Sequence, residues 1–109
     1  MQIAAVESLV LFDDPEIPRL IFELTKSQDL EVMKAAITGI GETKQNRYGV
    51  KIQSFLNHSD WGVRAAAARS LGRLKDSSAR SKLEDLEARD PDRLVSRAAQ
   101  FALSQINES

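Results

Sequence analysis

The sequence contains no cysteine and only one histidine, and this scarcity excludes several kinds of chemistry. Without a thiol the chain cannot form disulfides, thiolate metal sites, iron–sulfur clusters or a cysteine nucleophile. His58 has no second histidine with which to share a metal and no serine–acid arrangement to work with, so we expect a surface or capping residue. No glycine-rich phosphate loop occurs. We therefore expect no catalytic site, no metal and no cofactor.

The sequence also lacks a long apolar run and a large net charge. No segment is apolar over the length that a membrane-spanning helix needs, and the absence of cysteine suits a reducing compartment, so we expect a cytoplasmic location. The net charge of −1 argues against attraction of the whole protein to nucleic acid. The charge is unevenly distributed, however, with −5 over residues 1–31, +7 over 32–82 and −3 over 83–109.

What the sequence does contain is an internal repeat. Segments 1–12, 32–43, 63–74 and 95–106 align with starts 31, 31 and 32 residues apart, and each carries an Ala-Ala pair. The small and aliphatic residues of each copy follow the spacing of one packed face of an α-helix. In the third copy this face is Val63, Ala66, Ala67, Ser70, Leu71 and Leu74, and the spacing places Ala65 and Ala68 outside it.

Three further helical stretches lie between these segments, at 15–27, 46–58 and 79–90. Their apolar columns repeat every 31 residues and are Ile21, Ile52, Leu83 and Leu24, Phe55, Leu86. Helix starts are indicated by N-cap candidates, which are Asp14, Asp29, Asn46, Asp60, Asp90 and either Ser77 or Ser78. No segment alternates as a strand does. The sequence therefore predicts an all-α solenoid of about seven helices stacked as antiparallel hairpins.

The stretch from Asp60 to Leu74, DWGVRAAAARSLGRL, resembles the short HEAT-like repeat of phycobilin-lyase-type proteins. The resemblance extends over one domain, residues 1–109, with a half repeat at 1–12 and full repeats at 15–43, 46–74 and 79–106. It implies binding or scaffolding rather than catalysis, or an accessory role in a tetrapyrrole-lyase-type complex. It also implies a polar ladder between adjacent repeats, for which only Asp60 and Arg64 match the motif in full.

In solenoids of this type the inner helices commonly line the binding surface. Arg64, Arg69 and Arg73, flanked by Lys34 and Arg97, predict a basic groove for an acidic partner or a nucleic-acid backbone. The alternative is a solvated face on which Arg64 is paired with Asp60.

Apolar residues are also predicted to project from the packed face of the inner helices, namely Val6, Met33, Ile37, Ala68 and Phe101. These residues either bind a peptide or pack on a neighbouring helix. Trp61, in the turn before an inner helix, either anchors a partner or covers the seam between repeats.

The leading hypothesis is a non-enzymatic protein-interaction or scaffolding module. Its predicted contact residues are Met33, Lys34, Ile37, Trp61, Arg64, Arg69, Arg73, Arg97 and Phe101. The alternative is nucleic-acid or acidic-partner binding through the basic segment 32–82. Segment 1–12 is apolar almost all round and begins within a repeat, from which we expect either the C-terminal part of a longer protein or self-association through this helix.

Overall fold

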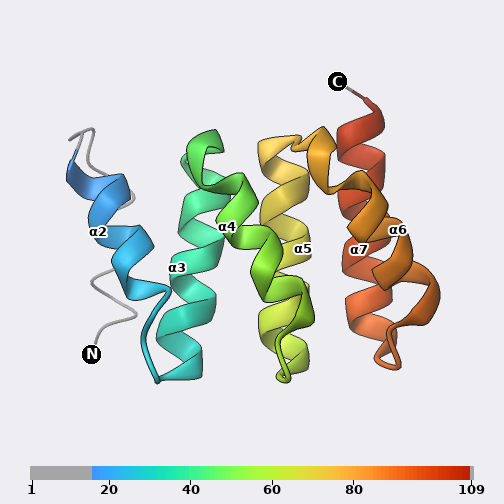
Figure 1. Ribbon diagram of the computed structural model, residues 1–109, viewed down its shortest axis with the longest axis horizontal. Coiled ribbons are helices and arrows are strands. Elements are labelled where there is room, and N and C mark those ends of the chain that lie inside the picture. Colours follow the sequence, from blue (N-terminus) through green and yellow to red (C-terminus); the bar gives the residue numbers. More distant parts are fainter. Residues whose placement is uncertain (1–15, 109) are drawn as a thin grey trace.

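The computed structural model describes residues 16–108, with side chains from Arg19 onward (Figure 1). Within this range the chain forms helices joined by short turns and contains no strand. The α-helices are α2 (Glu16–Leu24), α3 (Leu30–Glu42), α4 (Gly49–Gln53), α5 (Trp61–Leu74), α6 (Arg80–Arg89) and α7 (Arg93–Asn107). Short 3-10 helices are η1 (Asn46–Tyr48), η2 (Ser54–Asn57) and η3 (Ser77–Ala79). The predicted half repeat at 1–12, Val6 within it and the Asp14 cap lie outside the described residues.

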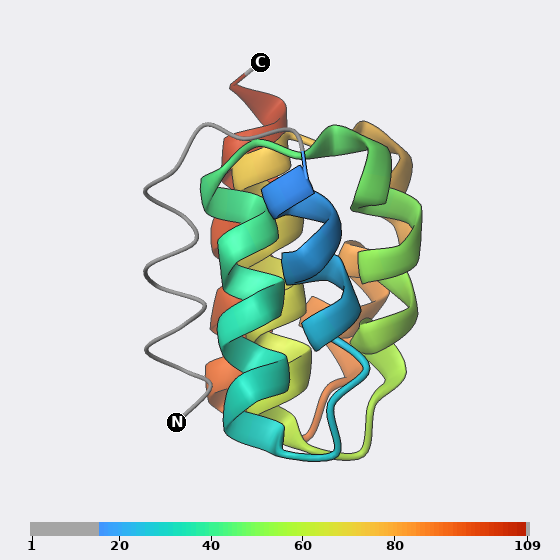
Figure 2. The same cartoon turned by 90° about the vertical axis from the view of Figure 1, so that its left-hand side faces the viewer.

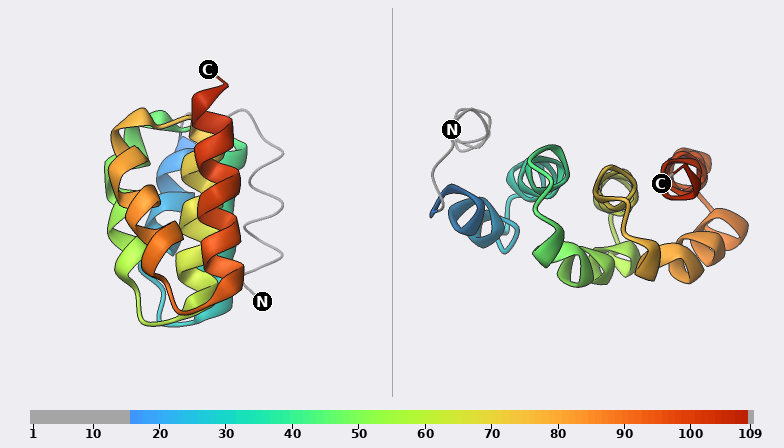
Figure 3. Two further views of the ribbon diagram at one scale, coloured as in Figure 1. Left: turned by 90° about the vertical axis from the view of Figure 1, so that its right-hand side faces the viewer. Right: turned by 90° about the horizontal axis from the view of Figure 1, so that it is seen from above.

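The helices form two layers. Viewed from above, α3, α5 and α7 make an inner row and α2, α4 and α6 an outer row, and both rows curve so that the inner row is concave (Figure 3). The view from the α2 end shows the same two layers (Figure 2). In the inner row α5 packs against both α3 and α7. The shortest dimension is 17 Å, which matches two layers of helices.

The three inner helices begin with the same aspartate cap. Asp29, Asp60 and Asp92 precede α3, α5 and α7, and each carboxylate accepts a hydrogen bond from a backbone N–H in the first turn. Such caps satisfy N–H groups that have no partner inside the helix. The predicted caps Asp29 and Asp60 are therefore confirmed.

The other cap predictions within the described residues were wrong. Asp90 ends α6 instead of starting α7, and Asp92 takes the cap position. Asn46 is the first residue of η1, and its side chain donates to the carbonyl of Leu74 at 2.7 Å. At the start of η3, Asp76 accepts from the N–H of Ser78, so neither Ser77 nor Ser78 is the cap.

Helices α3 and α5 also end alike, at a lysine with positive φ. Lys44 has φ 57° and Lys75 has φ 53°. The backbone N–H of Asp76 donates to the carbonyl of Leu71, and the backbone N–H of Lys75 donates to the carbonyl of Gly72. These two bonds form the Schellman pattern of a helix C-terminus. Glycine adopts this left-handed conformation more readily than lysine, so both positions are strained.

The repeated columns form the core. Ala36, Ala67 and Ala99 are fully buried in the inner layer. Ile21, Ile52 and Leu83 are buried in the outer layer, and the column from Leu24 through Phe55 to Leu86 is half-buried against the core. These are the positions that the repeat predicts. Small residues let the inner helices approach closely, as a methyl group on Gly72 would lie 2.6 Å from the Cα of Ala102.

The predicted limits of the packed face were wrong at three residues. Ala65, Ala68 and Ile37, which the spacing places outside the packed face, are all buried. Ala68 follows Ala65 by three residues and precedes Gly72 by four, so all three lie on one side of α5. That side meets α7. Helix α5 is covered by α3, by α7 and by the outer layer, so it buries more than one face.

Candidate partner-binding surfaces

The exposed stripe of α5 is basic but narrow. Arg69 and Arg73 lie one helical turn apart, and both are exposed at the inner surface. Neither guanidinium makes an ion pair with a described residue. These two arginines are therefore the part of the predicted basic groove that is available to an anionic group.

Arg64 does not belong to this stripe. Its guanidinium reaches the next repeat, where Nε donates to Oδ2 of Asp90 at 2.8 Å and Nη2 to Oδ1 at 3.3 Å. Nη1 donates to the backbone carbonyls of His58 and Ser59. Its side chain is 15% exposed and that of Asp90 4% exposed. Arg64 therefore links consecutive repeats, and the prediction that it pairs with Asp60 was wrong.

Lys34 is also occupied by neighbouring carboxylates. Its Nζ lies 2.6 Å from a carboxylate oxygen of Glu31 one turn earlier. The hydrogen bond to Glu31 raises the pKa of Lys34 above its ordinary value, burial acts in the opposite direction, and the charges of Glu31 and Asp60 raise it further. Because its charge is balanced locally, Lys34 adds little to a basic groove.

Helix α7 presents an apolar stripe to the inner surface. Leu94 is 48% exposed and Phe101, two turns later, is 43% exposed. One repeat of 32 residues separates Phe101 from Arg69, so these two positions face the same way on neighbouring helices. Trp61 at the first turn of α5 is also exposed. Two apolar side chains of α7 and two arginines of α5 therefore share one surface.

Three remaining candidates differ in position. Arg97 is exposed and corresponds to Ala65 in the repeat, so it lies on the side of α7 that faces away from α5. Met33 is half-buried against the core. Ile37 is 0% exposed, so the prediction that it lines a binding surface was wrong.

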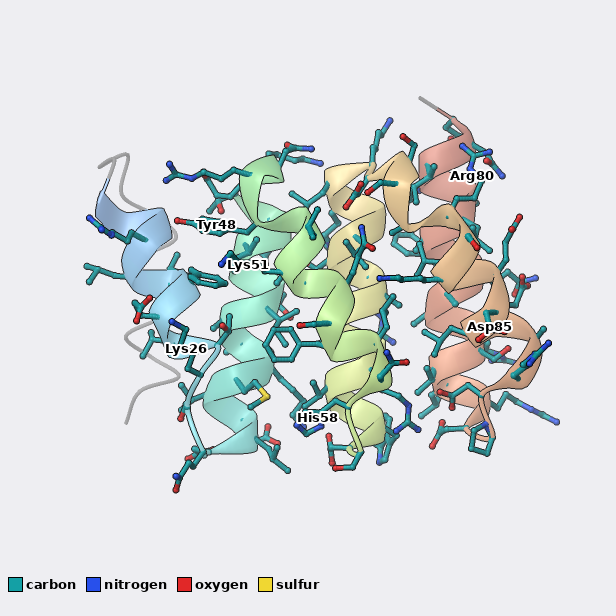
Figure 4. The ribbon with its side chains drawn as sticks, in the orientation of Figure 1. Lys26, Tyr48, Lys51, His58, Arg80 and Asp85 are labelled. Carbon is teal, nitrogen blue, oxygen red and sulfur yellow. The ribbon has the colours of Figure 1, made fainter. Side chains whose placement is uncertain are left out.

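The outer layer contains a groove that sequence reasoning missed. A cavity of about 360 Å³ lies between η2 and α6 and is lined in part by Leu56, Leu86, Asp85 and Arg89. His58 and Arg64 also line it. Leu56 and Leu86 also line a second cavity, of about 330 Å³. Figure 4 shows Asp85 and Arg80 along α6 on this side of the molecule.

His58 has a structural role within the described residues. Its Nδ1 accepts a hydrogen bond from the N–H of Asp60 at 3.0 Å, and its carbonyl accepts from Arg64. Among residues 16–108 no group of histidine and acidic side chains could hold a metal ion. Hydrogen bonds to the side chain and to the carbonyl of His58 therefore fix the turn before α5.

Comparison with known proteins identifies the repeat class. A protein-family model described as HEAT repeats matches residues 51–104, from α4 to the last turns of α7. No curated protein matches the chain. The match and the stacked hairpins support a HEAT-like repeat protein and confirm the predicted all-α solenoid, whereas the phycobilin-lyase type is not confirmed. None of the helices within the described part of the chain is long and apolar enough to cross a membrane.

Proposed function

We propose that the protein is a non-enzymatic interaction module whose inner surface binds an amphipathic segment of a partner protein. HEAT repeats commonly mediate protein–protein interaction, which supports this class of function. The observation that carries the proposal is the stripe of Leu94 and Phe101 on α7 beside Arg69 and Arg73 on α5.

Exposed apolar side chains of this size gain from burial against a partner. An amphipathic helix could place its apolar residues over Leu94 and Phe101, which are two turns apart. Acidic residues on one flank of that helix would then meet Arg69 and Arg73, whose charges have no local partner among the described residues. Trp61 at the first turn of α5 is also exposed and would add an apolar contact to a partner that reaches it.

Site-specific photo-cross-linking tests this surface in the full chain. A photoreactive phenylalanine analogue at Phe101 should give a discrete protein adduct that is lost when Arg69 and Arg73 are both changed to Glu. The matched control carries the analogue at Ala88, an exposed apolar residue of α6 on the outer layer. Equal adducts at both positions, or none at Phe101, would contradict the proposal.

Reconstitution with the purified partner then measures the affinity. Leu94→Ser with Phe101→Ser should weaken binding about tenfold or more, because two apolar anchors are lost at the centre of the interface. Ala88→Ser on the outer layer should leave binding unchanged.

Nucleic-acid binding is the second candidate, and the unpaired Arg69 and Arg73 favour it. This alternative requires an affinity that falls steeply with salt and is lost when both arginines are changed to Glu. Titration with a single-stranded oligonucleotide at low salt tests it, and an absence of binding there would remove it.

A further inference from the structure

We propose that a second surface, on the outer layer, binds a carboxylate-rich segment of a protein partner. This basic–aromatic patch consists of Phe22, Lys26, Arg47, Tyr48 and Lys51, which come from α2, η1, α4 and the turn after α2. It lies in the layer opposite the inner surface, so it goes beyond the proposed function.

The centre of the basic–aromatic patch is a stacked pair of aromatic rings. The centroids of Phe22 and Tyr48 lie 4.6 Å apart, and the ring planes are inclined by 8°. Both rings are half-buried and pack against the core. Figure 4 shows Tyr48, Lys51 and Lys26 along the seam between α2 and α4. The stack therefore joins two repeats and gives the surrounding side chains a rigid support.

Three cations lie over these rings. The Nζ atoms of Lys26 and Lys51 are 5.3 and 5.2 Å from the centroid of Phe22, and Cζ of Arg47 is 5.0 Å from that of Tyr48. Cation–π attraction restrains these long side chains before any ligand arrives. Less conformational entropy is then lost when they bind an anion.

The charge of the patch is poorly balanced. Among the described residues Glu23 lies 3.3 Å from Nζ of Lys26, and the carboxylate of Asp76 lies beside Gly49 and accepts from the amide of Gln53. Between residues 43 and 59 the sequence has no aspartate or glutamate, and neither Arg47 nor Lys51 forms an ion pair with a described residue. Helix α6 of the same layer carries equal numbers of acids and bases. An anionic partner is therefore favoured on this half of the outer layer.

The geometry favours carboxylates over a nucleic acid. Single-stranded nucleic acids bind by stacking bases on free aromatic faces. In this patch the rings already stack on each other and carry cations, so they offer no free platform. Acidic side chains need no such platform, since a guanidinium such as that of Arg47 can bind a carboxylate through two parallel hydrogen bonds.

Titration of the ¹⁵N-labelled full chain with a synthetic peptide of alternating glutamate and serine tests the proposal. Amide shifts should change in α2, η1 and α4, and the effect should weaken as salt is raised. Arg47→Glu with Lys51→Glu should weaken peptide binding about tenfold, because two attractive charges become repulsive. Circular dichroism checks that this variant stays folded, which we expect because both side chains are exposed.

Arg69→Glu with Arg73→Glu on the inner surface is the matched control and should leave peptide binding unchanged. This variant is also the one that should abolish the cross-link at Phe101, so the two proposals can fail independently. No shift at low salt, or shifts confined to α5 and α7, would overturn the outer site. A single-stranded oligothymidylate that binds the patch more tightly than the peptide would assign the surface to nucleic acid instead.

Discussion

Two seams join the described repeats, and they are closed by different means. The first seam lies between the α2–α3 and α4–α5 hairpins, where Phe22 stacks on Tyr48 and the hydroxyl of Ser70 donates to the carbonyl of Ile37 at 2.8 Å. The second seam lies between the α4–α5 and α6–α7 hairpins. There the Arg64–Asp90 ion pair crosses the seam, and a groove remains open in the outer layer.

The repeat register explains this difference. Phe22 and Tyr48 of the first seam correspond, one repeat later, to Gln53 and Ala79. The Gln53 amide donates to Asp76 at 3.1 Å and to Ser78 at 2.9 Å, so this part of the second seam is closed by hydrogen bonds. The same backbone arrangement therefore gives an aromatic, cationic contact in the first seam and a hydrogen-bonded one in the second. The groove lies elsewhere along the second seam, around Leu56 and Leu86.

The largest effect is expected from removing the ion pair of the second seam. Arg64→Met should lower the free energy of unfolding by about 2–4 kcal/mol, because the buried Asp90 carboxylate loses its guanidinium. Urea unfolding measures this change. The control is Arg89→Met, whose partner Asp85 is exposed and whose loss should cost less than about 1 kcal/mol. Equal losses in the two variants would show that burial of the pair is unimportant.

Overpacking the inner side of the second seam should be nearly as costly. Ala65→Leu should destabilise the fold by about 1–3 kcal/mol, because the side of α5 that meets α7 has no room for a larger side chain. Ala67→Leu, in the repeated alanine column, should behave similarly. Thermal unfolding of both variants tests whether Ala65 is buried. If Ala65 faced solvent, only Ala67→Leu would lower the melting temperature.

A smaller loss is expected in the first seam. Tyr48→Ala should cost about 1–2 kcal/mol, because the ring is only half-buried and the stack with Phe22 is lost. Tyr48→Phe keeps the ring and should be close to wild type in urea unfolding. If both variants were equally destabilised, the hydroxyl rather than the stack would be responsible.

The smallest change concerns the helix ends at the two seams. Lys75→Gly should stabilise the protein by about 1 kcal/mol by relieving the left-handed backbone. Lys44→Gly should gain less, since the Lys44 ammonium also donates to the carbonyl of Arg73 at 2.8 Å. Differential scanning calorimetry compares the two, and a lower melting temperature for Lys75→Gly would contradict the assigned strain.

The repeat predicted the layers well because its period directly encodes which residues face the core. The caps Asp29 and Asp60 were also predicted correctly, since capping depends on the residue type just before the helix. It failed for Ala65 and Ile37, because a helical period describes one packed face and carries no count of the neighbours around a helix. It also failed for Arg64, whose partner lies 26 residues further on, in the next repeat.

The functional surfaces were predicted less well for the same reason. The stack of Phe22 and Tyr48 was missed, although its members are separated by the same 26 residues as Arg64 and Asp90. A search for complementary residues at that offset, slightly less than one repeat, would have found both pairs. Arg69, Arg73 and Phe101 are exposed, as the predicted inner surface requires. The basic character of that surface is lower than predicted, because Lys34 pairs with Glu31 and Arg64 with Asp90.

The hydrogen bond from Ser70 to Ile37 has a consequence for how the chain folds. It spans 33 residues, and among the described residues no side-chain hydrogen bond reaches further along the chain. Within residues 16–108, stacking neighbouring helices therefore closes loops of about one repeat, which lowers the entropic cost of folding and favours a fast reaction. Structure can spread outward from α5, which has a partner on either side, so its amides should be the last to exchange with solvent.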